Sequence, residues 1–180
     1  MNLRFAGFGG QGVVLCGLVF GRAAMLDGKN ALQTQAYGSA SRGGLTKADV
    51  CIQPGEIHDL VCDGLDVLVA LSREAYERYH GAIAAAGTLF YESDLVEVDP
   101  APGTRRFGVP ATDIAFKQFG RKIIANMVMM GFVNAIAEVV SDASLDRVIR
   151  DSVPRGTEEK NLAALEEGRR LGAAALAAQG

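Results

Sequence analysis

The chain has 180 residues, enough for one domain with a full core and too few for two ordinary domains. Its 18 lysines and arginines against 21 aspartates and glutamates give a formal charge of −3 without a basic run, which argues against nucleic acid as a partner. The cysteines (Cys16, Cys51, Cys62) and the histidines (His58, His80) are isolated in the sequence, so we do not expect this chain alone to hold an iron–sulfur cluster or a zinc ion.

The same features predict where the protein works. Scattered cysteines suit reduced thiols in a reducing compartment. The N-terminus lacks the charged-then-apolar order of a signal peptide. The most apolar later run, residues 123–137, is interrupted by Asn126 and Asn134 and is shorter than a membrane span. We therefore expect a cytoplasmic protein without a membrane span.

A glycine turn near the N-terminus is the main candidate site. A short buried strand, residues 3–6, leads into the turn, and an apolar helix starts at Val13. Gly7, Gly9 and Gly12 fit the G-x-G-x-x-G pattern in the strand–turn–helix context that this pattern requires. Because the first amides of a helix have no partner within it, the turn can seat a phosphate or a carboxylate.

The second predicted strand, residues 30–35, weakens a dinucleotide interpretation. An NAD site needs an acidic residue at the end of this strand for the ribose, whereas this chain has Gln33, Thr34 and Gln35. Asp27 precedes the strand and lies in the turn before it. A stand-alone NAD(P)-binding Rossmann oxidoreductase is therefore an alternative and not the prediction.

A polar, glycine-rich loop, residues 36–45, follows with Arg42 directly before Gly43 and Gly44. It is either a surface loop with a solvated arginine, or a second lip of the glycine-turn site with Arg42 aimed at a phosphate or at a partner's carboxylate. The residues themselves leave both alternatives open.

The remaining pattern alternates between strands and helices. Residues 46–53 predict a half-exposed strand that is antiparallel or near an edge, and residues 66–71 predict a central strand buried on both faces. The further elements expected are a helix over 73–86 capped by Ser72, strands 88–91 and 105–109, helices 114–119, 121–140 and 145–152 (capped by Ser144), and a last helix capped by Thr157. This order predicts an α/β fold: a three-layer, Rossmann-like, open and mostly parallel sheet with helices on both faces and a helical C-terminal third.

Two carboxylates, Glu92 and Asp94, follow an inner strand at its carboxyl end. Such a pair can serve as general acid and base, but turn and helix-capping roles are commoner and are favoured here. The chain lacks a G-x-S-x-G elbow, an H-E-x-x-H motif and a P-loop lysine. We therefore predict a ligand- or subunit-docking domain without a catalytic residue of its own.

Four stretches resemble, in order and spacing, the gamma subunit of 2-oxoacid:ferredoxin oxidoreductases: FAGFGGQG (5–12), QTQAYGSASRGG (33–44), DVLVALSREAY (66–76) and VPRGTEEKNLAALEEG (153–168). The similarity runs nearly end to end and is greatest for the 2-oxoglutarate type, with the ketoisovalerate and pyruvate types close behind. It implies that residues 1–180 form a single gamma-type domain. The small subunit of indolepyruvate:ferredoxin oxidoreductase, which shares the turn and the Arg-Gly-Gly loop, is the alternative within this group.

The resemblance implies a subunit that is inactive alone and belongs to a larger enzyme. Such an enzyme converts a 2-oxoacid and coenzyme A to an acyl-CoA and carbon dioxide, and passes two electrons to ferredoxin. Thiamine diphosphate and iron–sulfur clusters are implied on the partners, which are thiamine-binding alpha and beta subunits and a ferredoxin-like delta subunit. Coenzyme A is implied as a co-substrate in a shared site. The residues implied to bind it, or to face the catalytic subunits, are Gly7, Gly9, Gly10, Gln11, Gly12, Tyr37, Arg42, Gly43 and Gly44.

Overall fold

A computed structural model describes residues 1–38, 44–58, 64–99 and 103–178 of the chain. Its strands are β1 (Asn2–Phe8), β2 (Asn30–Tyr37), β3 (Leu45–Gln53), β4 (Leu65–Ala70), β5 (Ile83–Glu92) and β6 (Arg105–Val109). Its α-helices are α1 (Val13–Leu26), α2 (Arg73–Tyr79), α3 (Ala111–Phe119), α4 (Ala125–Ala137), α5 (Asp142–Ser152) and α6 (Glu158–Ala177), with short 3-10 helices η1 (His80–Ala82) and η2 (Lys122–Ile124).

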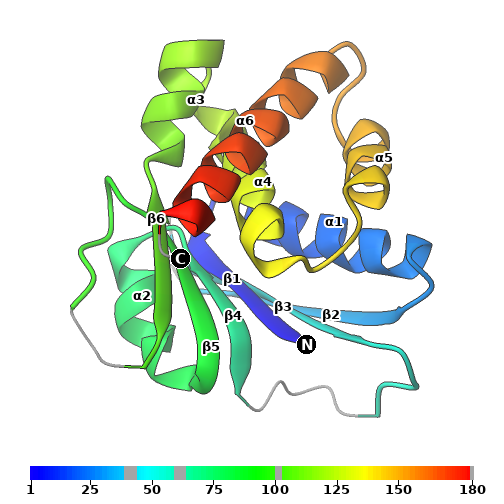
Figure 1. Cartoon of the computed structure of the whole chain (residues 1–180), viewed down its shortest axis with the longest axis vertical. Coiled ribbons are helices and arrows are strands. Elements are labelled where there is room, and N and C mark those ends of the chain that lie inside the picture. The colour runs from blue at the N-terminus through cyan, green and yellow to red at the C-terminus, as the bar shows by residue number, and fades with distance from the viewer. Residues whose placement is uncertain (39–43, 59–63, 100–102, 179–180) are drawn as a thin grey trace.

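The strands form one sheet in the order β2-β3-β1-β4-β5-β6 (Figure 1). β1, β4, β5 and β6 pair in parallel, while β3 is antiparallel to both β1 and β2. The sheet is therefore mostly parallel, as predicted. Because α1 follows β1 onto one face and α2 follows β4 onto the other, the chain changes faces between these two neighbouring strands.

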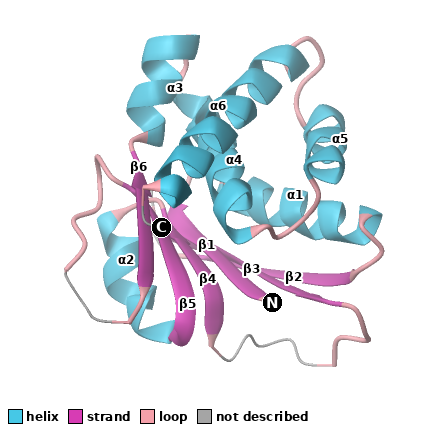
Figure 2. Ribbon diagram, in the orientation of Figure 1, coloured by secondary structure: helices cyan, strands magenta, loops and turns pink. Residues whose placement is uncertain are grey.

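Helices cover the two faces of the sheet unequally (Figure 2). The layer that contains α1, α3, α4, α5 and α6 lies on one face, and α2 lies on the other. Beneath the larger layer, Phe90 of β5 packs edge-on against Phe132 of α4 with ring centroids 6.1 Å apart. A smaller core beneath α2 contains Leu68 and Leu89. Burial of apolar side chains on both faces explains why the central strands read as continuous apolar runs.

The antiparallel pairing predicted for residues 46–53 is confirmed in β3, but the strand is not half-exposed as predicted: Asp49 on its polar face is buried, and Lys47 and Gln53 are half-buried. Ala48, Val50 and Ile52 are buried under α1, and the strand is antiparallel to both neighbours. The helix can approach this closely because it has glycines on the side that faces the sheet. A Cβ added to Gly17 would lie 2.9 Å from the Cβ of Ala48, nearer than side chains pack.

The helix expected over residues 73–86 is shorter than predicted. Ser72 caps α2 as expected, by accepting a hydrogen bond from the Ala75 amide (3.3 Å), but the helix ends at Tyr79. Residues 83–86 belong to β5, whose first residue, Ile83, pairs with Leu65 of β4. Pairing with the central strand thus overrides the helix propensity of an alanine-rich segment.

The long helix expected over residues 121–140 is also shorter than predicted. Its first part is the 3-10 helix η2, and α4 ends at Ala137. The side chain of Asn134 ends the helix, because Oδ1 accepts from the Val140 amide (3.2 Å) and Nδ2 donates to the Val140 carbonyl (3.0 Å). These bonds offer the backbone an alternative to another helical turn. Glu138 follows α4 in a left-handed conformation (φ 46°).

Two predicted caps differ in detail. Ser141, and not Ser144, is the N-cap of α5, because its extended backbone lets Oγ accept from the Ser144 amide (3.2 Å). Thr157 does precede α6, but its hydroxyl donates to the Pro154 carbonyl (2.7 Å) and does not cap the helix. The end of α3 at Gly120 is confirmed, with this glycine in the left-handed conformation.

The sheet face opposite α1 carries a buried carboxylate. Asp49 accepts hydrogen bonds from Arg4 (2.5 and 2.8 Å) and Lys47 (2.7 Å). Burial by itself raises the pKa of Asp49, but the bonds from these two cations lower it below its ordinary value.

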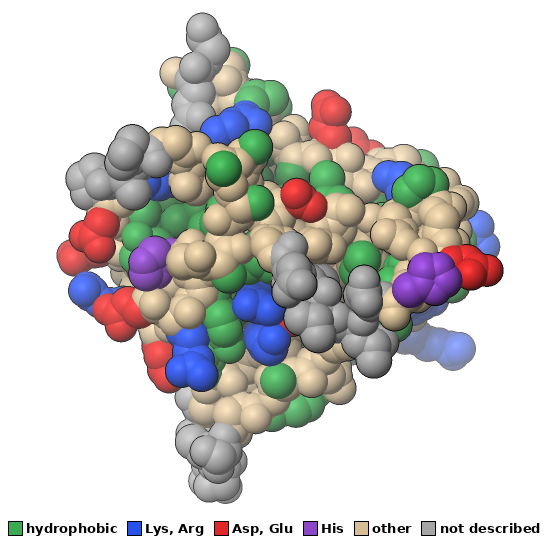
Figure 3. Space-filling view, turned by 90° about the horizontal axis from the view of Figure 1, so that it is seen from below, with side chains coloured by type: hydrophobic (Ala, Val, Ile, Leu, Met, Phe, Trp, Pro, Cys, Tyr) green, Lys and Arg blue, Asp and Glu red, His purple; other side chains and the backbone are tan. Residues whose placement is uncertain are grey.

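The two histidines lie on opposite sides of the molecule when it is seen from below (Figure 3).

Among residues 1–38, 44–58, 64–99 and 103–178, no group of histidine, cysteine, aspartate and glutamate side chains is arranged to hold a metal ion. No helix there is both long enough and apolar enough to cross a membrane.

Candidate functional site

The glycine turn connects the carboxyl end of β1 to the start of α1. Gly10 (φ 97°) and Gly12 (φ 77°) have left-handed backbones, which only glycine adopts readily. Gly7 is required for another reason, because an added Cβ would overlap the side-chain oxygen of Gln11. Gly12 is the N-cap of α1 and provides no side-chain hydrogen bond to the first amides of the helix. The turn therefore has the backbone geometry of an anion seat.

The side chain of Gln11 points inward and stabilises the turn. Its Oε1 accepts from the Phe8 amide (2.6 Å), and its Nε2 donates to the Leu71 carbonyl at the end of β4 (2.8 Å). Both polar atoms are thus engaged within the protein. Gln11 was predicted among the binding residues, and its contribution to a ligand site is fixing the turn against the neighbouring strand.

The structure brings the second loop next to the turn. The Gly9 amide donates to the Gly44 carbonyl (3.3 Å), and the Gly38 amide closes the β2–β3 hairpin on the Leu45 carbonyl (2.8 Å). Tyr37, at the end of β2, is 65% exposed. The positions of these residues fit a second lip. Arg42 and Gly43, which complete the predicted loop, lie outside the described residues.

A cavity of about 320 Å³ adjoins the base of this hairpin. It is lined by Tyr37 and Gly44 from the hairpin and by Glu74, Arg78 and Tyr79 from α2. Arg78 therefore places a second cation beside the loop that carries Arg42. No local sequence signal indicates this proximity, because α2 lies near the hairpin only since β4, which precedes α2, pairs with β1 next to β3.

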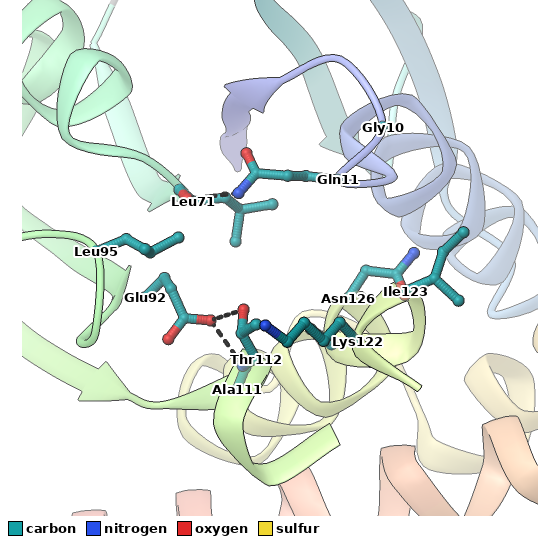
Figure 4. A pocket seen from close by; sticks show the side chains of 11 residues that line it. Gly10, Gln11, Leu71, Glu92, Leu95, Ala111, Thr112, Lys122, Ile123 and Asn126 are labelled. Carbon is teal, nitrogen blue, oxygen red and sulfur yellow. Dashed lines mark hydrogen bonds between the residues drawn. The ribbon is translucent and has the colours of Figure 1, made fainter. Parts of the chain in front are cut away.

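A second cavity of about 320 Å³ lies on the other side of the turn (Figure 4). It occupies the carboxyl ends of β1, β4 and β5, where the chain changes faces of the sheet and where open α/β folds bind ligands. The residues that line it are Gly10, Gln11, Leu71, Glu92, Leu95, Ala111, Thr112, Lys122, Ile123, Ala125 and Asn126. We call it the turn cavity. Of the predicted site residues, it contains Gly10 and Gln11.

Glu92 caps α3 at the wall of the turn cavity. Its carboxylate accepts from the Thr112 amide (2.9 Å) and from the Thr112 hydroxyl (2.8 Å). Burial raises the pKa of Glu92, although these two bonds lower it in part. Asp94 contributes only its backbone amide, 3.5 Å from Glu92. The capping interpretation of Glu92 is thus confirmed.

The cysteines differ in burial. Cys16 of α1 is buried in the core, and burial raises the pKa of its thiol to about 12, so this thiol is inert at neutral pH. Cys51 is half-buried on β3, and Cys62 lies outside the described residues.

Comparison with known proteins gives the family. The family model described as pyruvate ferredoxin/flavodoxin oxidoreductase matches residues 2–171. The chain belongs to this family. It is 42% identical over 170 residues to the 2-oxoglutarate synthase subunit KorC of Methanocaldococcus jannaschii, a match that covers 93% of this chain and 91% of the relative. The indolepyruvate oxidoreductase subunit IorB of Methanothermobacter thermautotrophicus is less similar, at 27% identity over 201 residues.

Solved structures agree with this family. The gamma subunit of a keto/oxoacid ferredoxin oxidoreductase from Geobacter sulfurreducens superposes with a TM-score of 0.85 at 34% identity, and the match covers 97% of this chain and 99% of that chain. The 2-oxoglutarate:ferredoxin oxidoreductase of Magnetococcus marinus, with 2-oxoglutarate, coenzyme A and succinyl-CoA bound, shares the fold at 24% identity (TM-score 0.84; 97% of this chain, 31% of that one). The present chain is thus a gamma-type subunit of a multi-subunit 2-oxoacid:ferredoxin oxidoreductase.

Proposed function

We propose that this chain is the gamma subunit of a 2-oxoglutarate:ferredoxin oxidoreductase. Such a complex converts 2-oxoglutarate and coenzyme A to succinyl-CoA and carbon dioxide, and passes two electrons to ferredoxin. The choice of 2-oxoacid is supported by the 42% identity to a 2-oxoglutarate synthase subunit. The chain acts as one gamma-type domain over residues 1–180, is inactive alone, and completes the coenzyme A site.

One observation carries the coenzyme A assignment: the hydrogen bond from the Gly9 amide to the Gly44 carbonyl. It joins the glycine turn to the second loop beside an uncapped helix start, where a pyrophosphate can accept hydrogen bonds from backbone amides. Arg42 precedes Gly44 by two positions in that loop and supplies a guanidinium for a phosphate. The full set of proposed binding residues is Gly7, Gly9, Gly10, Gln11, Gly12, Tyr37, Arg42, Gly43 and Gly44.

Thiamine diphosphate and the iron–sulfur clusters belong, in this proposal, to the partner subunits. These partners are alpha and beta subunits that bind thiamine diphosphate, together with a ferredoxin-like delta subunit, in a cytoplasmic complex. The lack of a metal-binding group among the described residues is compatible with clusters held elsewhere. The role of this chain is then to bind, orient and cover, and the redox chemistry takes place on its partners.

The proposal is tested by isolating the chain with its natural partners under anaerobic conditions. We expect thiamine- and cluster-bearing subunits to co-purify, and the eluate to oxidise 2-oxoglutarate with a viologen dye only when coenzyme A is present. Activity with indolepyruvate instead would transfer the chain to the indolepyruvate enzyme. A single chain that binds NAD tightly would overturn the proposal.

Replacement of Arg42 tests the phosphate contact. In the assembled complex, Arg42→Ala should raise the KM for coenzyme A by about ten- to a hundredfold, because a charge-assisted phosphate contact contributes about 1.5–3 kcal/mol and each 1.4 kcal/mol corresponds to a factor of about ten. The matched control is Arg147→Ala, which removes an exposed arginine from α5 that lines none of the cavities described above. If Arg42→Ala weakens only subunit assembly, Arg42 contacts a partner chain and not the coenzyme.

A further inference from the structure

A buried side chain at the start of α4 lacks the hydrogen bonds that its position demands. Asn126 lines the turn cavity and is 7% exposed, and its Oδ1 is fully buried. Within the described residues this oxygen has no hydrogen-bond partner. Its carboxamide lies against Gly12, where an added Cβ would overlap Nδ2. An unpaired buried carboxamide costs free energy of folding, so its presence needs an explanation.

The other polar side chains at this cavity are already engaged or lie at its mouth. Gln11 bonds Phe8 and Leu71, and the carboxylate of Glu92 bonds Thr112. Lys122 is exposed, with its Nζ 5.4 Å from the centre of the Phe116 ring. Figure 4 shows Asn126 between the glycine turn and Lys122. Asn126 is thus the group of this cavity that is both buried and unsatisfied.

The walls around Asn126 favour an uncharged, largely apolar ligand. Leu71 forms part of the inner wall, and two large apolar side chains, Leu95 and Ile123, remain 48% and 72% exposed at the rim. The volume, about 320 Å³, is at the lower end of the range for small-ligand sites. A phosphate could not satisfy the buried Oδ1, because that oxygen needs a hydrogen-bond donor.

An amide is the group that matches a carboxamide, because it carries both a donor and an acceptor. The carboxamide of Asn126 can present either atom to the cavity, since rotation about its terminal bond exchanges them. Coenzyme A contains an uncharged arm with amides between its pyrophosphate and its thiol. Gly10 and Gln11 belong both to the proposed phosphate seat and to the wall of the turn cavity, so one molecule can occupy both places.

We propose that the turn cavity binds the amide-bearing pantetheine arm of coenzyme A, and that the Asn126 carboxamide pairs with one of its amides. This inference rests on the proposed function, because it takes the glycine turn as the phosphate seat. Lys122 and Ile123 then border the path along which the arm leaves the cavity toward the partner subunits. Asn126 binds the co-substrate in this scheme and takes no part in the bond-forming steps.

The test uses the assembled complex and S-methylpantetheine, which has the amides but neither phosphate nor a free thiol. Asn126→Ala should raise the calorimetric Kd of this probe about two- to tenfold, the range for one neutral hydrogen bond, and should raise the KM for coenzyme A by a similar factor. Arg42→Ala should raise the KM for coenzyme A and leave the Kd of the probe unchanged. Asn126→Asp, which keeps the shape and loses the donor, should weaken the probe as well.

The matched control is Asn134→Ala, which removes a buried asparagine two turns further along α4 and should leave both constants unchanged. Unchanged probe binding in Asn126→Ala would overturn the inference while leaving the proposed function intact. If Asn126→Ala lowers the yield of assembled complex while the complex that does form binds the probe with an unchanged Kd, the inference is overturned too, and the cavity is assigned to a segment of a partner subunit. A complex whose activity does not depend on coenzyme A would instead overturn the proposed function, and the inference with it.

Discussion

Helix α4 carries an asparagine at each end, and their surroundings differ completely. Asn134, at the far end, is 3% exposed and uses its carboxamide to bond both backbone groups of Val140 and the carboxylate of Asp142. Asn126, at the near end, is equally buried, yet its Oδ1 has no partner in the described ranges. The same side chain stabilises the fold at one end of the helix and is left open to a ligand at the other.

The difference extends beyond the two side chains. At the far end, Asp27 accepts hydrogen bonds from the amide and hydroxyl of Ser141 (2.7 and 2.6 Å) and from the hydroxyl of Ser144 (2.5 Å), which ties α1 to α5. At the near end, Gly10 of the glycine turn and the first residues of α3 and α4 line the turn cavity. The far end of α4 is thus held by hydrogen bonds that stabilise the fold. The near end borders a cavity at the carboxyl edge of the sheet, where ligands of this fold class bind.

The largest loss of stability should come from a substitution in the middle of α4, because the packing of this helix positions both asparagines. An added Cβ at Gly131 would overlap the Leu165 carbonyl of α6, so Gly131→Ala must force these helices apart. We expect the free energy of unfolding to fall by about 3 kcal/mol or more in urea denaturation. The control is Gly21→Ala in α1, where the nearest atoms would be 3.8 and 3.9 Å away. That change should be neutral or slightly stabilising, and equal losses in both variants would refute the packing explanation.

A smaller difference in the free energy of unfolding should distinguish the two asparagines directly. Asn134→Ala leaves the buried backbone groups of Val140 unpaired and should lower the free energy of unfolding by about 2 kcal/mol. Asn126→Ala breaks no hydrogen bond of the described structure, so it should cost less than about 1 kcal/mol. Thermal and urea unfolding of the two variants measure this contrast. A cost for Asn126→Ala as large as that for Asn134→Ala would show that Asn126 is a structural residue.

The smallest effect concerns the pH dependence of folding stability at the far end of α4, where Asp27 lies. Burial alone raises the pKa of Asp27, but the hydrogen bonds from Ser141 and Ser144 lower it below its ordinary value. A carboxyl group with a lowered pKa stabilises the fold above its unfolded pKa of about 3.9, and this stabilisation is lost as the pH falls through the folded pKa. Asp27→Asn should therefore lose less stability between pH 7 and pH 3 than the unmodified chain does. The control Asp151→Asn, at an exposed site on α5, should leave that difference unchanged.

Local sequence signals were reliable where one segment determines its own structure. The alternation of residues 46–53 predicted an antiparallel strand whose apolar side chains share one face, and the apolar run at residues 66–71 predicted a central strand. Glycine marked the end of α3 at Gly120. Prediction failed where two distant segments compete for the same residues. Ile83 leaves a helical pattern to pair with Leu65, a contact that no short window of sequence contains.

The sequence by itself determined the α/β class, the glycine turn and the family resemblance, because these depend on residue types and spacing along the chain. Only the tertiary structure decided that Gln11 points inward, that Glu92 caps α3, and that Asn126 meets Gly12 at a cavity. Each of these outcomes depends on which partners the fold brings within hydrogen-bond distance. Asn126 and Gly12 are more than a hundred positions apart in the chain, so folding alone brings them together.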